Sequence, residues 1–291
     1  MQVVLHFGAP YTDENRLQLC LGKNREALAE AGTVIPRPSA YRRRMKPVIN
    51  RFKEGTGDDE LRMEFFDEVV GDREADRVVF SMDNFLGVPR LAVSNESFFP
   101  GHFNRIGAFL HLFDGADVEL YYAICNPANF VQGLMKGHQG EDINALLSHS
   151  DPMNLRWSEF MERLCENFPT TPVIAWCNED TPLIWDKLIR DLAGVDDTFD
   201  LRGNFGFIKE IMSDEGFSRF SDFLKQRPDM SGEQKQRVTA AFLEKFAVED
   251  VLEEDIDYPG WTDEHVAAVT EMYEADVDFI QTLPNVRFLQ P

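Results

Sequence analysis

The sequence is poor in the residues that build metal sites and disulfide frameworks. Its four cysteines lie far apart and form no C-x-x-C pair, and its six histidines form no H-x-x-x-H pair. This spacing argues against a structural zinc site and against a set of disulfide bonds. We therefore expect no bound metal ion and a reducing, cytoplasmic location.

Long apolar runs and positive charge are also scarce. No apolar run approaches the roughly 18–20 residues of a membrane-spanning helix, and no basic leader with a cleavage site precedes the first expected strand. The chain carries 29 Lys and Arg against 51 Asp and Glu, a formal net charge of −22. Such a surface repels nucleic acids and anionic membranes, so we expect neither as a partner.

Three common motifs are absent as well. The sequence contains no G-x-x-x-x-G-K-[ST], no G-x-G-x-x-G after the first expected strand, and no G-x-S-x-G. These patterns mark nucleoside triphosphatases, dinucleotide oxidoreductases and serine hydrolases. Their absence disfavours all three classes of enzyme.

The sequence does contain short apolar segments that alternate with helical patterns. Strands are expected at 2–7, 76–82, 118–124 and 171–177, and a short extended stretch at 33–36. Strands separated by helices are typical of parallel sheets with right-handed crossovers. We predict an α/β fold with a central, mostly parallel sheet flanked by helices, in a single domain over residues 1–291.

Two regions are expected to depart from this alternation. The basic, poorly periodic segment 37–57 is interpreted as a long loop with some helix. From residue 203 onward only helices are expected, so the C-terminal part (about 203–291) is predicted to be helical. Within it, Ser231 and Gln234 match a capping box before a helix.

The first thirty residues have the organisation of a phosphate-binding unit. A short buried strand (2–7) is followed by a loop and by a helix from Glu14 to Gly32. This geometry aims backbone N–H groups and a helix dipole at an anion. The loop chemistry differs, because Tyr11 and Asp13 stand where a working phosphate loop has Lys and small residues.

The same region resembles the N-terminus of bacterial sulfotransferase-like proteins. That family opens roughly on L-H-I-G-x-x-K-T-G-T-T-x-L-Q, followed by N-R-x-x-L-A-x-x-G-x-x-Y-P. The matching residues here are Val4-Leu5-His6-Phe7-Gly8, Thr12, Leu17-Gln18, Asn24-Arg25, Leu28-Ala29, Gly32 and Ile35-Pro36. The match runs without gaps over about the first 36 residues and continues beyond them only as strand order. The resemblance implies the sulfotransferase branch of the phosphate-loop (P-loop) fold and the donor 3′-phosphoadenosine 5′-phosphosulfate (PAPS).

Both donor-binding elements of that family are altered in this chain. Tyr11 stands at the position of the Lys that neutralises charge during sulfuryl transfer, Asp13 stands at a Gly position, and Thr12 is retained. The Arg and Ser that hold the donor's 3′-phosphate correspond to Cys125 and Gly133. A carboxylate beside a dianion repels it by roughly 1 kcal/mol or more per close pair, even in water-like screening.

The resemblance also supplies candidate site residues. Asp83 follows a strand where similar proteins have Ser-x-Glu, so it is a candidate catalytic base; alternatively, it caps the following turn. Arg16 is a candidate replacement for the missing Lys; alternatively, it pairs locally with Asp13 or Glu14. The candidate donor-binding residues are Gly8, Ala9, Pro10, Tyr11, Thr12 and Asn15.

One basic segment is a candidate site for an anionic small-molecule acceptor. Forked guanidinium contacts suit a phosphorylated or sulfated group, whereas a charge run is also typical of a solvated loop. The residues are Arg42, Arg43, Arg44 and Lys46.

Two functional hypotheses follow, and the sequence leaves open whether the protein is an enzyme. In the first, it is a repurposed or non-catalytic relative of the sulfotransferases that does not bind PAPS in the usual way. In the second, it is an active sulfotransferase with a rearranged donor site that transfers a sulfuryl group to a hydroxyl or amine.

Overall fold

A six-stranded parallel sheet forms the centre of the molecule. The computed structural model describes residues 1–71, 73–248, 256 and 258–291. The strands follow the order β2-β3-β1-β6-β7-β8, and every neighbouring pair is parallel. They are β1 (Gln2–Gly8), β2 (Thr33–Val34), β3 (Arg77–Ser81), β6 (Asp117–Ile124), β7 (Val173–Cys177) and β8 (Val286–Phe288). The predicted α/β class with a parallel sheet is therefore confirmed.

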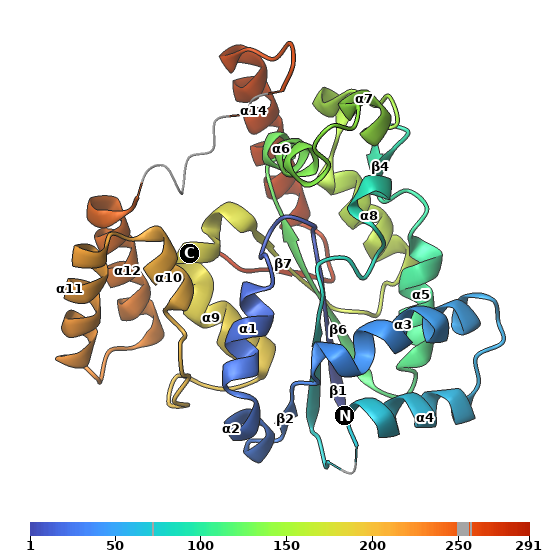
Figure 1. Cartoon of the computed structure of the whole chain (residues 1–291), viewed down its shortest axis with the longest axis horizontal. Helices are drawn as coiled ribbons and strands as arrows, with labels where there is room; N and C mark the ends of the chain where they lie inside the picture. Colours follow the sequence, from blue (N-terminus) through green and yellow to red (C-terminus); the bar gives the residue numbers. More distant parts are fainter. Residues whose placement is uncertain (72, 249–255, 257) are drawn as a thin grey trace.

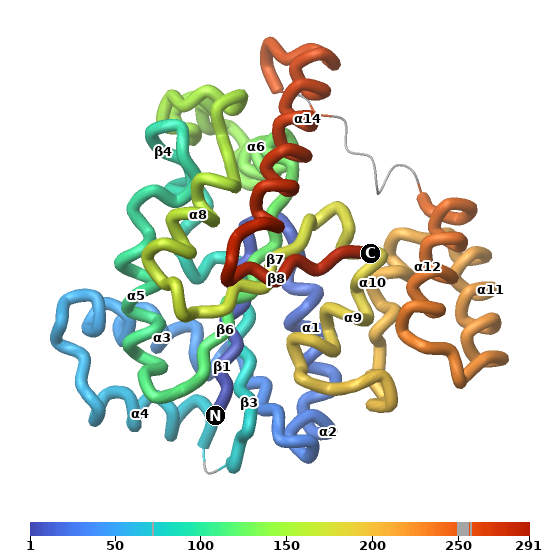
Figure 2. The backbone as a smooth tube through the Cα atoms, turned by 180° about the vertical axis from the view of Figure 1, so that it is seen from behind, coloured from blue at the N-terminus to red at the C-terminus, as the bar shows by residue number. Residues whose placement is uncertain are grey.

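Helices cover both faces of this sheet (Figures 1 and 2). Successive side chains of a strand point to opposite faces, so Val4 contributes to one core and Leu5 to the other. The first face is covered by α1 (Arg16–Lys23), α2 (Arg25–Glu30) and α9 (Thr181–Ala193). The second is covered by α3 (Pro38–Lys53), α4 (Asp59–Val69), α5 (Phe103–Leu112), α6 (Pro127–Gly137), α8 (Trp157–Asn167) and α14 (Asp263–Ile280).

A third, smaller cluster lies beside α9. Figure 1 shows the helices that follow α9 grouped there, and their buried residues, such as Phe220 and Leu243, form a core of their own. These helices are α10 (Gly206–Ile211), α11 (Asp214–Lys225) and α12 (Gly232–Phe246). The short α7 (Ile143–Leu146) follows α6. Among the described residues, no helix combines the length and apolarity needed to span a bilayer.

The N-terminal helix differs from the single helix that was expected up to Gly32. The structure has two helices, α1 and α2, which are separated at Asn24. Asn24 Nδ2 donates to the carbonyl oxygens of Cys20 (2.9 Å) and Arg202 (3.0 Å), and its Oδ1 accepts from the Arg202 N–H (2.7 Å). These side-chain bonds give the backbone an alternative to a continuous helical ladder.

The basic segment 37–57 is largely helical, so the prediction of a long loop was wrong. Helix α3 buries Tyr41, Met45, Ile49 and Phe52 along one stripe, at the spacing of one helix face. Pro47 lies inside this helix, and proline normally ends helical patterns. The proline and the many charged residues obscured the stripe.

The C-terminal part contains a strand, so the prediction of helices alone was also wrong. Strand β8 pairs with β7, with Val286 opposite Val173, and the Leu289 N–H donates to the Ala175 carbonyl at 2.8 Å. The strand has only three residues, which is too short for a periodic signal. A two-stranded antiparallel hairpin, β4 (Val93–Ser94) and β5 (Ser97–Phe98), was not expected either.

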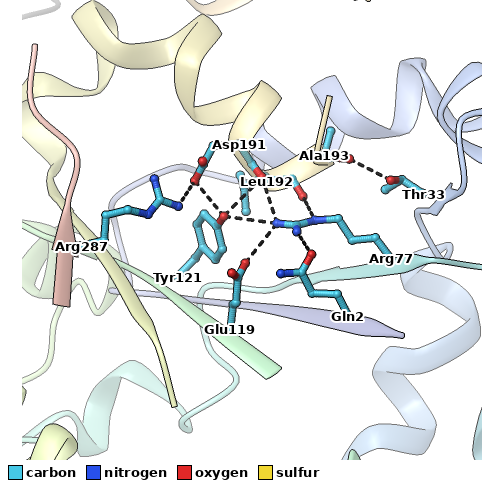
Figure 3. Close-up of polar contacts among 9 residues, drawn as sticks. All are labelled: Gln2, Thr33, Arg77, Glu119, Tyr121, Asp191, Leu192, Ala193 and Arg287. Carbon is cyan, nitrogen blue, oxygen red and sulfur yellow. Dashed lines mark hydrogen bonds and ion pairs between the residues drawn. The ribbon is translucent and has the colours of Figure 1, made fainter. Parts of the chain in front are cut away.

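At the amino ends of the strands, Arg77 ties helix α9 to the sheet (Figure 3). Its Nε donates to the Leu192 carbonyl and its Nη2 to the Asp191 carbonyl, both at 2.9 Å. The same guanidinium bonds the side chain of Gln2 and lies 3.2 Å from Glu119 Oε2. A cation on the last carbonyls of a helix complements its dipole.

Asp191 extends this network across the sheet (Figure 3). Its Oδ2 accepts from the Tyr121 hydroxyl at 2.8 Å and from Arg287 Nη2 at 2.6 Å. Burial and the Asp191 carboxylate raise the pKa of Tyr121. Thr33 Oγ1 donates to the Ala193 carbonyl at 2.8 Å, so the edge strand is held as well. The C-terminal end of α9 is thereby fixed to four strands.

Candidate functional site

The loop after β1 lies at the point in the sheet where the chain connections on the two sides of β1 run in opposite directions. Strand β1 pairs with β3 on one side and with β6 on the other, at the kind of switch point where parallel sheets form sites. Gly8 has a φ of +94°, and a Cβ there would come within 2.7 Å of the Asp83 carbonyl oxygen. The structure thus brings the loop and Asp83 together, and only glycine fits at this approach.

The side chain of Asp13 occupies the N-terminus of α1. It is 6% exposed, and its Oδ1 accepts from the Asn15 N–H (3.2 Å) while its Oδ2 accepts from the Leu17 N–H (3.3 Å). The N-terminus of a helix favours a negative charge at this place. The Asp13 carboxylate is therefore the anion at this helix N-terminus.

Other polar groups of the loop are engaged within the protein too. The Ala9 N–H donates to the Ala123 carbonyl at 2.8 Å, and Thr12 Oγ1 donates to the Ala9 carbonyl at 2.5 Å. Tyr11 and Asn15 have φ values of 67° and 64°, so the loop turns through left-handed conformations. The loop has a compact form that its own side chains maintain.

Tyr11 lies on helix α6, across two glycines. A Cβ on Gly133 would come within 2.8 Å of Tyr11 Cβ, and one on Gly137 within 2.9 Å of the Tyr11 hydroxyl. The Tyr11 ring also contacts Phe130 edge-on, with centroids 6.0 Å apart, and its hydroxyl lies 3.4 Å from His138 Nδ1. The residues at the family's Lys and Ser positions are thus in direct contact.

Asp83 and His6 are two of the titratable groups around this loop whose pKa values are shifted. Burial, with a smaller contribution from Asp13, raises the pKa of Asp83 to about 6. Burial lowers the pKa of His6, although Asp13 acts in the opposite direction. His6 Nδ1 lies 2.9 Å from Ser81 Oγ, and its Nε2 has no partner in the part of the chain that the structure describes.

Arg16 is engaged by two carboxylates. Its Nη2 lies 3.0 Å from Glu14 Oε2, its Nε lies 2.8 Å from Glu210 Oε2, and its guanidinium sits 5.0 Å from the centre of the Phe207 ring. Glu210 and Phe207 belong to α10. The guanidinium therefore links α1 to α10, and its charge is already paired.

The basic residues of α3 are divided between different surroundings. Arg42 Nη2 donates to Asn15 Oδ1 at 2.8 Å, so this residue borders the loop. Arg44 pairs with Glu68 of α4. Arg43 and Lys46 are exposed. Of the four expected acceptor-binding residues, the structure brings only Arg42 to the loop.

A second helix N-terminus also carries a carboxylate from elsewhere in the chain. Glu179 Oε1 accepts from the Asn126 N–H at 2.8 Å and from Asn129 Nδ2 at 3.2 Å, at the start of α6. Its Oε2 accepts from the Tyr273 hydroxyl at 3.0 Å. The sequence reasoning missed this role of Glu179, and no local pattern could have indicated it.

Helix α8 repeats the arrangement. Asp276 Oδ2 accepts from the Trp157 N–H at 2.7 Å, and Asp276 Oδ1 accepts from Ser158 Oγ at 2.6 Å. Trp157 Nε1 donates to the carbonyl of Cys125 at the end of β6, and burial raises the pKa of the Cys125 thiol. The N-termini of α1, α6 and α8 therefore each hold a carboxylate of the protein itself. Within the described ranges, no group of three or more His, Cys, Asp or Glu residues is placed to hold a metal ion.

No family model and no curated protein matches the chain. Among solved structures, the chain is similar to a sulfotransferase from Alicyclobacillus acidocaldarius, with 15% sequence identity and a TM-score of 0.39. The similarity covers 87% of this chain and 96% of that one.

Proposed function

We propose that this protein is a repurposed, non-catalytic relative of the sulfotransferases that does not bind PAPS in the usual way. The observation that supports this most directly is the buried Asp13 carboxylate on the N–H groups of Asn15 and Leu17. A phosphosulfate bound there would have to displace that carboxylate. If both remained, like charges would meet in a poorly solvated site, where repulsion is stronger than in water.

The position of Tyr11 gives independent support. Its side chain rests on Gly133 and Gly137, and burial raises the pKa of its hydroxyl to about 12. It is therefore a neutral side chain at the position where a donor site needs a cation. Cys125, at the family's Arg position, is buried, and burial raises the pKa of its thiol.

A calorimetric titration with 3′-phosphoadenosine 5′-phosphate, the stable donor product, tests the proposal. We expect no binding to the unmodified protein up to millimolar concentration. The double variant Tyr11→Lys with Asp13→Gly is expected to gain binding, because it restores the cation and removes the carboxylate. Tyr11→Met with Asp13→Asn is the matched control, which removes the carboxylate without adding a cation.

Either of two results would overturn this proposal. Micromolar binding to the unmodified protein would show that the donor site is intact in a rearranged form. The absence of any gain in the Lys–Gly variant, with its fold intact by circular dichroism, would show that the loop is not a phosphate loop.

The second candidate, an active sulfotransferase, is favoured by one observation. Asp83 borders Gly8, and a carboxyl with a pKa of about 6 suits a general base at neutral pH. If it acts in this way, the protein releases 3′-phosphoadenosine 5′-phosphate from PAPS when a hydroxyl or amine acceptor is added. Asp83→Asn would then lower that rate by about 10²-fold or more. An assay of donor turnover across acceptors separates the two functions.

A further inference from the structure

A pocket of about 360 Å³ lies between α9 and α12, with α10 beside it. Figure 1 shows these helices grouped next to the sheet. None of the loop residues discussed above lines this pocket. Its volume falls within the range of small-molecule sites. Its apolar lining comes from Pro182, Leu183, Trp185, Val195, Phe205 and Ile208.

The acidic residues in the wall already have partners. Asp186 accepts from Arg190 Nε (2.9 Å) and from Asn204 Nδ2 (2.7 Å), and Asp197 accepts from the Gly232 N–H (3.2 Å). Asp191 belongs to the Arg77 network described above. Glu233, the remaining acid of the wall, is exposed at the start of α12. The carboxylates of Asp186, Asp191 and Asp197 are therefore committed to contacts within the fold.

The donor groups in the wall are only partly used. Arg190 is 6% exposed; its Nε bonds Asp186, its Nη1 bonds the carbonyls of Asp196 and Phe199, and no hydrogen bond within the described part of the chain engages its Nη2. Trp185 Nε1 and Gln236 Nε2 are buried and have no partner among the described residues.

Lys235 adds a further donor on α12. Within residues 1–71, 73–248, 256 and 258–291, no hydrogen bond or ion pair engages its ammonium group. Buried N–H groups usually have a partner, and a donor without one is costly. The buried atoms of this wall that lack a partner among the described residues are therefore N–H donors, and the wall also carries aromatic and aliphatic side chains.

We propose that this pocket binds a small aromatic monocarboxylate. A carboxylate offers two acceptor oxygens to the free guanidinium nitrogen and the ammonium group, and an aromatic body suits walls that include Trp185 and Phe205. A dianion such as phosphate fits less well, because Asp186, Asp191 and Asp197 line the same space. This inference is independent of the function proposed for the loop.

Calorimetric titration with three probes tests the ligand class. We expect saturable binding of phenylacetate with a dissociation constant of about 1 mM or lower. Phenylacetamide, which has the same shape without the charge, is expected to bind about tenfold more weakly. Inorganic phosphate is expected to give no saturable heat. Equal binding of the acid and the amide, or no saturable binding of phenylacetate at tens of millimolar, would overturn the proposal.

Substitutions in and beside the pocket test whether phenylacetate binds there. Leu183→Trp fills the cavity and is expected to weaken phenylacetate binding by about tenfold or more. Lys235→Gln removes one donor charge and is expected to weaken it about threefold or more. Arg237→Gln is the matched control, since Arg237 is exposed on the same helix, does not line the pocket and undergoes the same charge change.

Thermal unfolding shows that each variant is folded before it is titrated. Phenylacetate binding that survives Leu183→Trp in a folded protein, or that responds equally to Lys235→Gln and Arg237→Gln, places the ligand elsewhere and contradicts the proposal.

Discussion

The amino ends and the carboxyl ends of the strands form two opposite edges of the sheet, called here the amino edge and the carboxyl edge. The same electrostatic rule applies at both edges, but its consequences differ. At the amino edge, the cation Arg77 meets the carbonyls that end α9. At the carboxyl edge, the anions Asp13 and Glu179 meet the N–H groups that begin α1 and α6. Both placements complement a helix dipole.

The two edges differ in the polar groups that remain without a partner or with a shifted pKa. The Arg77 guanidinium is surrounded by acceptors, whereas the carboxyl edge keeps Asp83 with a raised pKa and His6 with an unpartnered Nε2 among the described residues. Groups with perturbed pKa values or unsatisfied hydrogen bonds occur more often at functional sites than in purely structural networks. We infer that the contacts at the amino edge stabilise the fold, whereas the carboxyl edge is the place for a functional site.

Removing Arg77 should give the largest loss of stability. The Arg77 side chain is 11% exposed and that of Glu119 is 21% exposed. Arg77→Met leaves this carboxylate and two helix carbonyls without their partner, so we expect the free energy of unfolding to fall by about 3 kcal/mol. Denaturant unfolding monitored by circular dichroism measures the change.

Arg219→Met is the control for that substitution. Arg219 pairs with Glu215 on the surface, where the two side chains are 60% and 68% exposed. Its loss is expected to cost about 0.5 kcal/mol or less. If the two variants lost similar stability, the amino edge would not be the anchor that its contacts suggest.

The contact between Tyr11 and α6 predicts an effect of intermediate size at the carboxyl edge. Gly133→Ala places a Cβ 2.8 Å from Tyr11 Cβ, so we expect a loss of about 2 kcal/mol. In a Tyr11→Gly background the clash is gone, and the same substitution should stabilise α6 by up to about 1 kcal/mol. A double-mutant cycle of unfolding free energies measures the coupling.

Gly107 provides the matched control in α5. A Cβ there would meet Phe168 at 3.7 Å, an ordinary van der Waals distance. Gly107→Ala is expected to leave stability unchanged or to raise it, in either background. Additivity between Tyr11→Gly and Gly133→Ala would mean that Tyr11 does not occupy the space that a side chain at position 133 would need.

Most of the fold was predictable because it depends on local pattern. Buried parallel strands are continuous apolar runs, and the segments 76–82 and 118–124 matched β3 and β6 closely. The failures have one local cause and one that is not local. Pro47 and the basic residues concealed the buried stripe of α3, and the three residues of β8 are held by pairing with β7 rather than by their own propensity.

The site was predictable only in part, because its chemistry depends on contacts between distant segments. The sequence indicated that Tyr11 and Asp13 were unusual in a phosphate loop. It could not indicate that Tyr11 lies on Gly137, or that Glu179 reaches the N–H of Asn126, 53 residues earlier. Such contacts follow from tertiary packing, which no spacing rule along the chain encodes.

The smallest expected effect on stability comes from the protonation of Asp83. The raised pKa of Asp83 fixes the direction in which stability changes with pH. Because the pKa of Asp83 is about 6 in the folded protein and 3.8 in its ordinary state, the folded protein binds more protons between these values. The contribution of Asp83 to stability therefore falls as the pH rises from about 4 to 6.5, after which it is constant. Asp83→Asn removes this penalty, since a neutral amide resembles the protonated acid.

We expect Asp83→Asn to gain about 1 kcal/mol of stability relative to the unmodified protein between pH 4.5 and pH 7.5, allowing for partial solvation of the group. Denaturant unfolding of both proteins across this range measures the difference, and Asn84→Ala, at an exposed neighbour, controls for disturbance of the turn. A pH-independent difference would show that Asp83 ionises normally. The carboxyl edge would then lack the unfavourable buried charge that distinguishes it from the Arg77 network, in which the charges are paired. The raised pKa that makes Asp83 a candidate base would also be absent.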